Sequence, residues 1–324
     1  MSRGLASSFK RRLSGEAAPG PDPRDLERRP LGAGPVRVAA ITCGRNEAAW
    51  LPRWIGYYGA QLGVENLYVV DDNSTDGSTD DLPCDVIRIP EVRDGEFEPA
   101  RMGVLGNLAR ALFHVYDAVI FTDVDEFVVP DPQKYDGLRD FVARQPNDTL
   151  ALAAQGLNVI HDVSHESTLD PAAPVLGQRC LAKFLPLMCK PALKWVPAHW
   201  SAASHGLNAP YRVHPDLWMF HMKFADVEQL RRNADLRKAQ VEVDGRSAQT
   251  NWSKGGDALV ELLEGLTSPD AYSAEVAEFT SPADLAALVV TDGPARWRAP
   301  RGNQLELMRK RPLVRIPERF HGIV

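Results

Sequence analysis

The strongest constraint on the fold is an alternation of apolar runs and amphipathic stretches between residues 36 and 122. Four runs predict strands: VRVAAIT (36–42), NLYVV (66–70), DVIRI (85–89) and AVIFT (118–122). Two stretches predict helices: NEAAWLPRWIGYYGAQLG (46–63) and PARMGVLGNLARALFHVY (99–116). The order strand, helix, strand, strand, helix, strand is typical of a parallel sheet covered by helices. We therefore expect an α/β fold.

The sequence after residue 150 gives weaker signals. Residues 150–160 and 217–224 predict strands, and residues 225–240 predict a helix. Between them, residues 161–178 predict a long loop, and such loops are often functional or mobile. We find no internal repeat and no second linker, so we expect a single domain.

Charge is unevenly distributed along the chain, whose formal net charge is −6. Residues 1–35 contain seven Lys and Arg against four Asp and Glu, and their Pro and Gly content predicts disorder. Residues 301–324 contain six against two and predict a basic C-terminal tail. The overall negative charge argues against nucleic acid as a partner. Weak contact of the basic termini with an anionic membrane surface stays open, although solvated ends are the simpler interpretation.

Cysteine usage and hydropathy predict the compartment. The four cysteines form no CxxC pair, which is typical of reduced thiols. No run approaches ~18 apolar residues, the length of a membrane span. The first residues, MSRGLASSFKRRLSG, lack the apolar core of a signal peptide. We expect a cytoplasmic protein, with a peripheral position at the inner membrane face as the alternative.

Three polar clusters follow predicted strands: CGRNE (43–47), DDNSTD (71–76) and DVDE (123–126). In sheets of this type, ligands bind outside the carboxyl ends of the strands. We therefore expect these clusters to line one crevice.

The cluster that follows the AVIFT strand places Asp123, Asp125 and Glu126 beside an apolar run. Like charges so close together require open water or a cation. In an extended D-x-D segment both Asp side chains point the same way, so they suit a hard divalent ion such as Mn²⁺ or Mg²⁺. An acidic loop that merely faces water is the alternative.

Asp71 and Asp72 directly follow a predicted strand. Asp, Asn, Ser and Gly form turns, so a tight loop is one interpretation. A carboxylate at this point is also suited to accept a hydrogen bond from a nucleotide base or a ribose hydroxyl.

The segment ITCGRNEAAWLPRWIGYYGAQLGVENLYVVDDNSTDGSTD (41–80), followed by IFTDVDEFVVP (120–130), resembles the nucleotide-sugar domain of family 2-type glycosyltransferases. The resemblance is specific over residues 36–130 and continues thinly through CKPAL (189–193), HWSAASHG (199–206) and LWMFHMKF (217–224). It implies a GT-A (Rossmann-like) fold with a mostly parallel central sheet flanked by helices. It also implies one domain, 36–300, with a nucleotide-binding half, 36–150, and an acceptor half, 151–300.

The resemblance implies roles for individual residues of the nucleotide-binding half. The nucleotide would be held by Thr42, Arg45, Asn46, Glu47, Asp71 or Asp72, and Arg101. In the D-x-D motif, Asp123 would face the ribose and the metal shell, and Asp125 would ligate the metal directly. The metal would bridge both phosphates and offset the charge of the leaving nucleoside diphosphate.

Relatives of this kind supply a further metal ligand from a later strand. The candidate is His221, with Lys223 on the same strand face and available to a phosphate oxygen. A lone His at a strand end is alternatively a structural hydrogen-bonding residue. Imidazole together with carboxylate favours Mn²⁺ over Mg²⁺.

The acceptor side is less well marked. An inverting transfer needs a general base near the acceptor hydroxyl, and we select Asp162 from several acids of the long loop. His199, Trp200 and His205 are candidates for the acceptor pocket, because aromatic faces stack on sugar rings. All of them have an alternative interpretation, as solvated loop residues or as core residues.

These expectations favour a metal-dependent glycosyltransferase with a nucleoside-diphosphate sugar as donor and a glycan or glycolipid as acceptor. Synthesis of cell-surface polysaccharide or glycolipid is the implied setting. One alternative is a nucleotidyltransferase that makes nucleotide sugars, but such enzymes carry a Gly-rich loop where this chain has only Gly44. A non-catalytic nucleotide- or carbohydrate-binding module of the same fold is the other alternative.

Overall fold

The computed structural model describes residues 26–90, 97–244, 253–268, 276–293 and 295–324. The main sheet contains ten strands in the described chain. Its path runs β13-β7-β6-β8-β4-β1-β2-β3, and β10 pairs with both β6 and β5. The strand bounds are β1 Val38–Gly44, β2 Leu67–Asp72, β3 Asp85–Ile89, β4 Ala118–Phe121, β5 Glu126–Pro130, β6 Ala151–Ile160, β7 Leu181–Phe184, β8 Leu193–Lys194, β10 Arg212–Phe224 and β13 Val314–Arg315.

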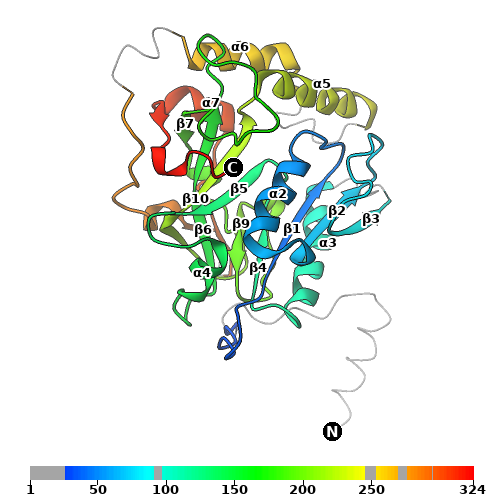
Figure 1. The fold of residues 1–324 in the computed structure, drawn as a ribbon, viewed down its shortest axis with the longest axis vertical. Coiled ribbons are helices and arrows are strands. Elements are labelled where there is room, and N and C mark those ends of the chain that lie inside the picture. Colours follow the sequence, from blue (N-terminus) through cyan, green and yellow to red (C-terminus); the bar gives the residue numbers. More distant parts are fainter. Residues whose placement is uncertain (1–25, 91–96, 245–252, 269–275, 294) are drawn as a thin grey trace.

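The helices and the short elements complete the chain. The α-helices are α2 Leu51–Leu62, α3 Phe97–Leu112, α4 Leu138–Ala143, α5 Val227–Asp244, α6 Gly256–Leu266 and α7 Gln304–Lys310. The 3-10 helices are η2 Val64–Asn66, η3 Pro186–Met188, η4 Ala202–Ser204, η7 Ala286–Leu288 and η8 Glu318–Phe320. A second small sheet joins β9 Gly206–Leu207, β12 Trp297–Arg298 and β11 Val290–Thr291. Figure 1 shows α2 in front of the early strands and α5 beside α6 at one end of the sheet.

The first four strands of the sheet are parallel, in the order β3-β2-β1-β4. Because side chains alternate along a strand, each strand contributes to two cores. Ala40 of β1 packs with Trp54 of α2, whereas Ala39 packs with Leu105 of α3. The two helices therefore cover opposite faces of the parallel strands, which is the layered arrangement of an α/β fold. The predicted strands and helices of residues 36–122 are confirmed within a few residues at their ends.

The sheet as a whole is mixed, so the prediction of a mostly parallel sheet is wrong. Between β4 and β13 every neighbouring pair on the path is antiparallel, and β5 pairs antiparallel with β10. In this half only β6 and β10 run parallel. These antiparallel pairs are not joined by short turns. β6 and β7 are separated by residues 161–180, and the other pairs join strands that lie further apart in the sequence.

Residues 301–324 differ from the predicted basic tail. They form α7, β13 and η8, and Met308, Ile316 and Phe320 are buried in the main core. The basic residues alternate with these apolar ones, so the segment has one face for the core and one for water. The charges alone predicted a tail, because the apolar residues between the basic ones were not considered.

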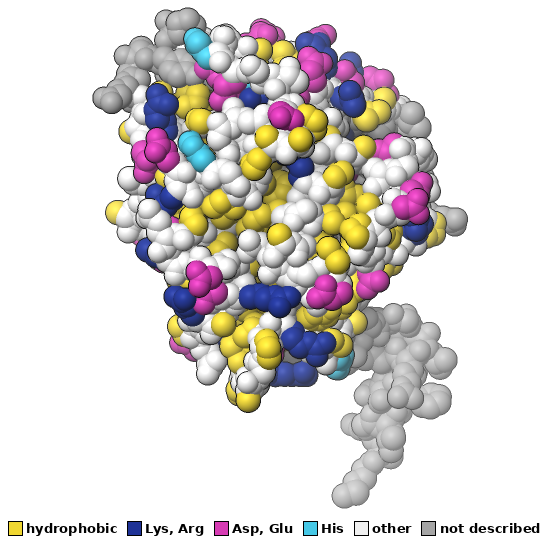
Figure 2. Space-filling view, in the orientation of Figure 1, with side chains coloured by type: hydrophobic (Ala, Val, Ile, Leu, Met, Phe, Trp, Pro, Cys, Tyr) yellow, Lys and Arg dark blue, Asp and Glu magenta, His cyan; other side chains and the backbone are white. Residues whose placement is uncertain are grey.

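The N-terminal prediction of disorder covers residues 1–35, of which 1–25 lie outside the described residues. From residue 26 the chain contacts the domain. Leu26 is buried, and the Arg28 guanidinium donates to the carbonyl oxygens of Gln145 and Pro146 and lies over the Trp195 ring. Among the helices of the described chain, none is both long and apolar enough to cross a membrane. The face seen in Figure 2 intersperses acidic and basic side chains around a more hydrophobic centre.

Candidate active site

The carboxyl ends of β1, β2 and β4 lie at one edge of the sheet. The register places Gly44 beside Asp71, and Ile41 beside Phe121, so these three strands end close together. The loops that follow are tied to one another. The backbone N–H of Asn46 donates to Ser74 Oγ (3.1 Å), and the Asn46 side chain accepts from Thr75 N (2.8 Å). The first two polar clusters predicted from the sequence are thereby brought together.

Asp123 and Glu126 are neutralised by cations of the protein itself. Asp123 accepts from Arg101 Nη1 and from Lys190 Nζ, both at 3.0 Å. Lys190 Nζ also donates to Glu126 Oε1 at 2.6 Å. Burial raises the pKa of Asp123, but Lys190 and Arg101 outweigh it and hold that pKa well below its usual range. The sequence analysis offered water or a metal as the compensating partner. Buried Lys190 is a third solution.

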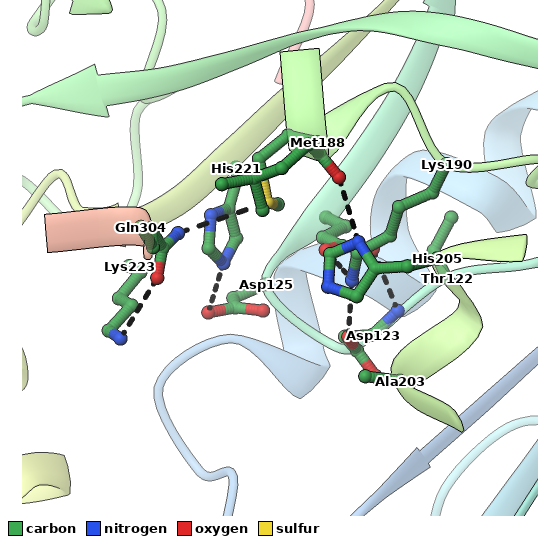
Figure 3. Close-up of polar contacts among 12 residues, drawn as sticks. Thr122, Asp123, Asp125, Met188, Lys190, Ala203, His205, His221, Lys223 and Gln304 are labelled. Carbon is green, nitrogen blue, oxygen red and sulfur yellow. Dashed lines mark hydrogen bonds and ion pairs between the residues drawn. The ribbon is translucent and has the colours of Figure 1, made fainter. Parts of the chain in front are cut away.

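Asp125 has a different partner. Its Oδ2 lies 3.3 Å from Nε2 of His221, which β10 presents to it. Strand pairing fixes both residues, because His221 lies opposite Glu126 and the Met222 N–H donates to the Asp125 carbonyl (2.8 Å). Burial raises the pKa of Asp125, but His221 lowers it by more. The pKa therefore lies below its ordinary value, and the group stays ionised. Asp125 and His221, both predicted as metal ligands, thus lie in contact in the fold (Figure 3).

A pocket lies on the far side of Asp125 from Lys190. Its wall combines Asp125 with three cations, Lys223, Arg237 and Lys254, and with the amides of Gln229 and Asn233. Burial lowers the pKa of Lys223 to about 8, and Arg237 contributes to this shift. A buried cation whose pKa is depressed by its neighbours is stabilised by an incoming anion. The pocket therefore suits an anionic group next to Asp125.

Near this pocket, Glu47 lies among an excess of negative charge rather than positive charge. Burial and, to a smaller extent, Asp125 together raise its pKa to about 8. The carboxylates on this side of the cluster are therefore not fully compensated by the side chains alone. A divalent cation near Asp125 would remove this repulsion.

The residues around Asp125 fit a divalent cation. His221 Nδ1 lies 2.6 Å from Asn158 Oδ1, so Nδ1 carries a proton and Nε2 is the nitrogen that faces Asp125 and could bind a metal. Ligands about 2.1 Å from a common metal at right angles lie about 3 Å apart, close to the observed separation. Within the described ranges, no three His, Cys, Asp or Glu side chains are grouped as a complete metal site. Asp125 and His221 would thus be two ligands of such an ion, and the other positions would fall to water and phosphate oxygens.

Several predicted nucleotide ligands turn out to organise the loops. Thr42 is buried, and its Oγ1 donates to the Thr122 carbonyl at 2.9 Å. Asp71 accepts from Ser74 N (2.8 Å) and from Thr79 Oγ1 (2.9 Å), which is the turn interpretation of this cluster. Asp72, one position on, projects to the opposite face of the strand.

Arg101 was predicted to bind the nucleotide, but in the structure it contacts the acidic cluster. Its guanidinium binds Glu98 as well as Asp123, and these two carboxylates raise its pKa above the ordinary value although burial lowers it. Arg101 therefore holds Asp123 in place, and any phosphate contact would have to share the same side chain.

The acceptor candidates lie in three different environments. Trp200 is buried, with its ring 5.2 Å from that of Phe121 and Lys194 Nζ 3.3 Å from its centroid, which favours the core alternative. His199 is half-buried against α3, where Gly106 leaves room for its ring. Asp162 accepts from Ser164 N and lies 2.8 Å from His165 Nδ1.

His205 lies closest to the acidic cluster among the acceptor candidates. Its Nδ1 donates to the Leu187 carbonyl at 2.7 Å, and burial lowers its pKa to about 3, with Lys190 contributing. The ring is therefore neutral, and Figure 3 shows it beside Lys190 and Asp123.

Sequence analysis missed five side chains of the site. Lys190, Asn158, Arg237, Lys254 and Gln304 line it or support it. Lys190 lies in the CKPAL segment, whose match to the family was noted without a role. The others carry no local signal, because their positions depend on how β6, α5 and α7 pack.

Comparison with known proteins gives only distant similarity. No family model matches the chain, and no curated protein matches it. Among solved structures, the mannosyltransferase PcManGT from Pyrobaculum calidifontis, in complex with GDP-Man and Mn²⁺, is 19% identical with a TM-score of 0.23. The match covers 49% of this chain and 43% of that one, so the chain spans less than half of its length.

Two further structures are similar at the same level. CMP:2-keto-3-deoxy-manno-octonic acid synthetase, complexed with CTP, is 14% identical (TM-score 0.22; 40% and 55% of the two chains). Mannose-1-phosphate geranyltransferase from Thermus thermophilus is 14% identical (TM-score 0.26; 72% and 65%). Such values describe a distant likeness in fold, so function has to be inferred from the side chains of the site.

Proposed function

We propose that the protein is a metal-dependent glycosyltransferase that uses a nucleoside-diphosphate sugar as donor. The observation that carries this proposal is the Asp125–His221 pair beside a pocket lined by Lys223, Arg237 and Lys254. A carboxylate and an imidazole suit Mn²⁺, and three adjacent cations suit the phosphates that such a metal binds. Mg²⁺ is the second choice for the metal.

The roles of the side chains follow from this arrangement. Asp125 and His221 would hold the metal, which acts as a Lewis acid for the departing diphosphate. Lys223 and Arg237 would bind phosphate oxygens from the pocket wall. Lys190 and Arg101 fix Asp123 toward the crevice, where it would meet the ribose. Asp72 and Arg45 at the neighbouring strand ends would bind the rest of the nucleotide.

The transfer breaks the bond between the sugar and the diphosphate and forms a bond from the sugar to an acceptor hydroxyl oxygen. A base has to take the acceptor proton. Asp162 remains our prediction for this base, and His199 and His205 our predictions for the acceptor pocket. The acceptor would be a glycan or glycolipid of the cell surface, bound by residues 151–300.

Calorimetry tests the metal and nucleotide assignment. Titration of UDP, GDP and dTDP into the protein should show binding by at least one of them that requires Mn²⁺. Asp125→Ala should abolish that binding while the circular dichroism spectrum stays native. The matched control is Asp216→Ala, which removes an acid that pairs with Lys134, outside this cluster. Binding that survives in the Asp125→Ala protein would end the metal assignment.

A product assay separates the glycosyltransferase from the nucleotidyltransferase. Incubation with nucleotide sugars and Mn²⁺ should release nucleoside diphosphate slowly by hydrolysis. Release of pyrophosphate from a nucleoside triphosphate and a sugar phosphate would instead support the second function.

A further inference from the structure

A chain of hydrogen bonds joins Lys223 to His221 by way of α7 and β6. Lys223 Nζ lies 3.4 Å from Gln304 Oε1, and Gln304 Nε2 lies 3.2 Å from Asn158 Oδ1. The same Asn158 oxygen lies 2.6 Å from His221 Nδ1. Figure 3 shows Gln304 between Lys223 and the His221 ring. The amide groups of Gln304 and Asn158 thus connect a pocket cation with a candidate metal ligand.

Lys223 sets the direction of every bond in this chain. A lysine ammonium only donates, so Gln304 has to turn its oxygen toward Lys223 and its NH₂ toward Asn158. The weak acceptor Met188 Sδ, 3.8 Å from Gln304 Nε2, favours the same orientation. Asn158 then presents its oxygen to both neighbours. His221 Nδ1 must therefore donate, which leaves Nε2 as the nitrogen that faces Asp125 and is open to exchange a proton for a metal.

We propose that Gln304 and Asn158 are positioning residues that hold His221 in the Nδ1–H tautomer and keep Nε2 available to a divalent cation. The inference rests on the proposed function for the identity of the cation, but the tautomer is a property of the protein alone. It has one visible cost: the buried Asn158 Nδ2 has no hydrogen-bond partner among the described residues. Turning the amide around would place two donors, Asn158 Nδ2 and Gln304 Nε2, against each other.

The start of α7 is built to hold Gln304 in this position. Asn303 caps the helix, and its side chain accepts from Leu305 N (3.0 Å) and Glu306 N (3.3 Å). Leu305 and Met308 anchor the helix in the core. Gln304, the first residue of α7, is thereby fixed against β6 and β10. A segment predicted as a tail is part of the site.

Two conservative substitutions are expected to have opposite effects on the position of the His221 proton. Gln304→Glu keeps the length of the side chain and an acceptor for Lys223 but presents only acceptors to Asn158. Asn158 should then turn its NH₂ toward both neighbours, so His221 Nδ1 becomes an acceptor and the proton moves to Nε2. Asn158→Asp keeps acceptors toward both Gln304 and His221, so the Nδ1–H tautomer should persist.

Nitrogen NMR of metal-free protein labelled with ¹⁵N-histidine reads the tautomer directly. Spectra are recorded about one unit above the ordinary histidine pKa of about 6.5 and below the pKa of Lys223, so that Lys223 stays an ammonium, and the His221 signals are assigned by their loss in His221→Gln. Native protein and Asn158→Asp should show a protonated Nδ1, and Gln304→Glu an Nδ1 without a proton. Calorimetry with Mn²⁺ alone should show a loss of affinity on the order of tenfold or more for Gln304→Glu and only a small change for Asn158→Asp.

The outcomes separate this inference from the proposed function. An unprotonated Nδ1 in the native protein, or an Nδ1 that stays protonated in folded Gln304→Glu, overturns the positioning role whatever the metal does. An inverted tautomer with undiminished Mn²⁺ affinity also overturns it. If native protein binds no Mn²⁺, the proposed function fails, while the spectra still decide whether the two amides set the tautomer.

Discussion

Two parts of one short acidic segment are stabilised in different ways. Asp123 and Glu126 are held by Lys190, and Asp123 also by Arg101, so their charge is balanced inside the protein. Asp125, between them in sequence, faces His221 and a small pocket lined by cations. The two carboxylates of the first part therefore need no metal to balance their charge, whereas the one in the second part lies at the proposed metal position.

The difference shows that the spacing of acidic residues does not by itself identify the metal ligands. An extended chain would place Asp123 and Asp125 on the same side, and both were expected at the metal, but residues 124 and 125 form a turn. The deciding factor is the cation brought in from a distant segment. Lys190 comes 67 residues after Asp123 and neutralises the first position of the motif.

The largest effect is expected for Lys190→Met, which tests the difference between the two parts of the acidic segment. The change leaves Asp123 and Glu126 buried without their shared cation, so the free energy of unfolding should fall by about 3–5 kcal/mol. Chemical denaturation measures it. Lys134→Met, which breaks the more exposed pair with Asp216, should cost no more than about 1 kcal/mol. Equal losses of unfolding free energy in Lys190→Met and Lys134→Met would mean that Lys190 does not stabilise the acidic cluster.

The second test uses the pH dependence of stability on the Asp125 side. The Glu47 carboxyl has a pKa of about 8 in the native state, against about 4.3 for an unfolded Glu. The native state therefore retains a proton that the unfolded state loses, and stability should fall as pH rises from about 4 to about 8.

Urea titrations across that pH range should show that Glu47→Gln reduces this loss of stability. The size of the effect should be on the order of 1–3 kcal/mol, because water screens part of the shift. The same change at exposed Glu228 should leave the slope unaltered. A slope that is the same in Glu47→Gln and native protein would show that Glu47 is ionised in the fold.

The smallest expected effect is that of Asp125→Asn on the metal-free protein. The amide retains the size of the carboxylate and its contact with His221, so the unfolding free energy should change by less than about 1 kcal/mol. Thermal melts in a chelating buffer measure this change. A loss comparable with that of Lys190→Met would erase the distinction between the two parts of the segment.

The early fold could be predicted because local signals agree there. Each of the first four strands is an apolar run that ends in a turn signal, and α2 and α3 fill the crossovers. The later half offers no such agreement. β8 and β13 are two residues long, and their antiparallel pairing depends on contacts with distant strands. Predicted from charge alone, residues 301–324 were mistaken for a tail.

The site divides in the same way. Asp125 and His221 could be selected from the sequence, Asp125 by its motif just before β5 and His221 by its position on β10. Lys190, Asn158 and Gln304 could not, because isolated Lys, Asn and Gln residues have no pattern that separates them from surface residues. Trp200 shows the reverse error, in which an aromatic residue near the motif lies in the core against Phe121.

The position of Gln304 at the start of α7 has a consequence for synthesis of the protein. Asp125, just before β5, and His221, on β10, leave the ribosome well before residue 304 does. A nascent chain stalled between residues 230 and 300 would hold both side chains without the amide that orients the imidazole. Competence to capture a cation would then arise late in translation, after most of the sheet has been made.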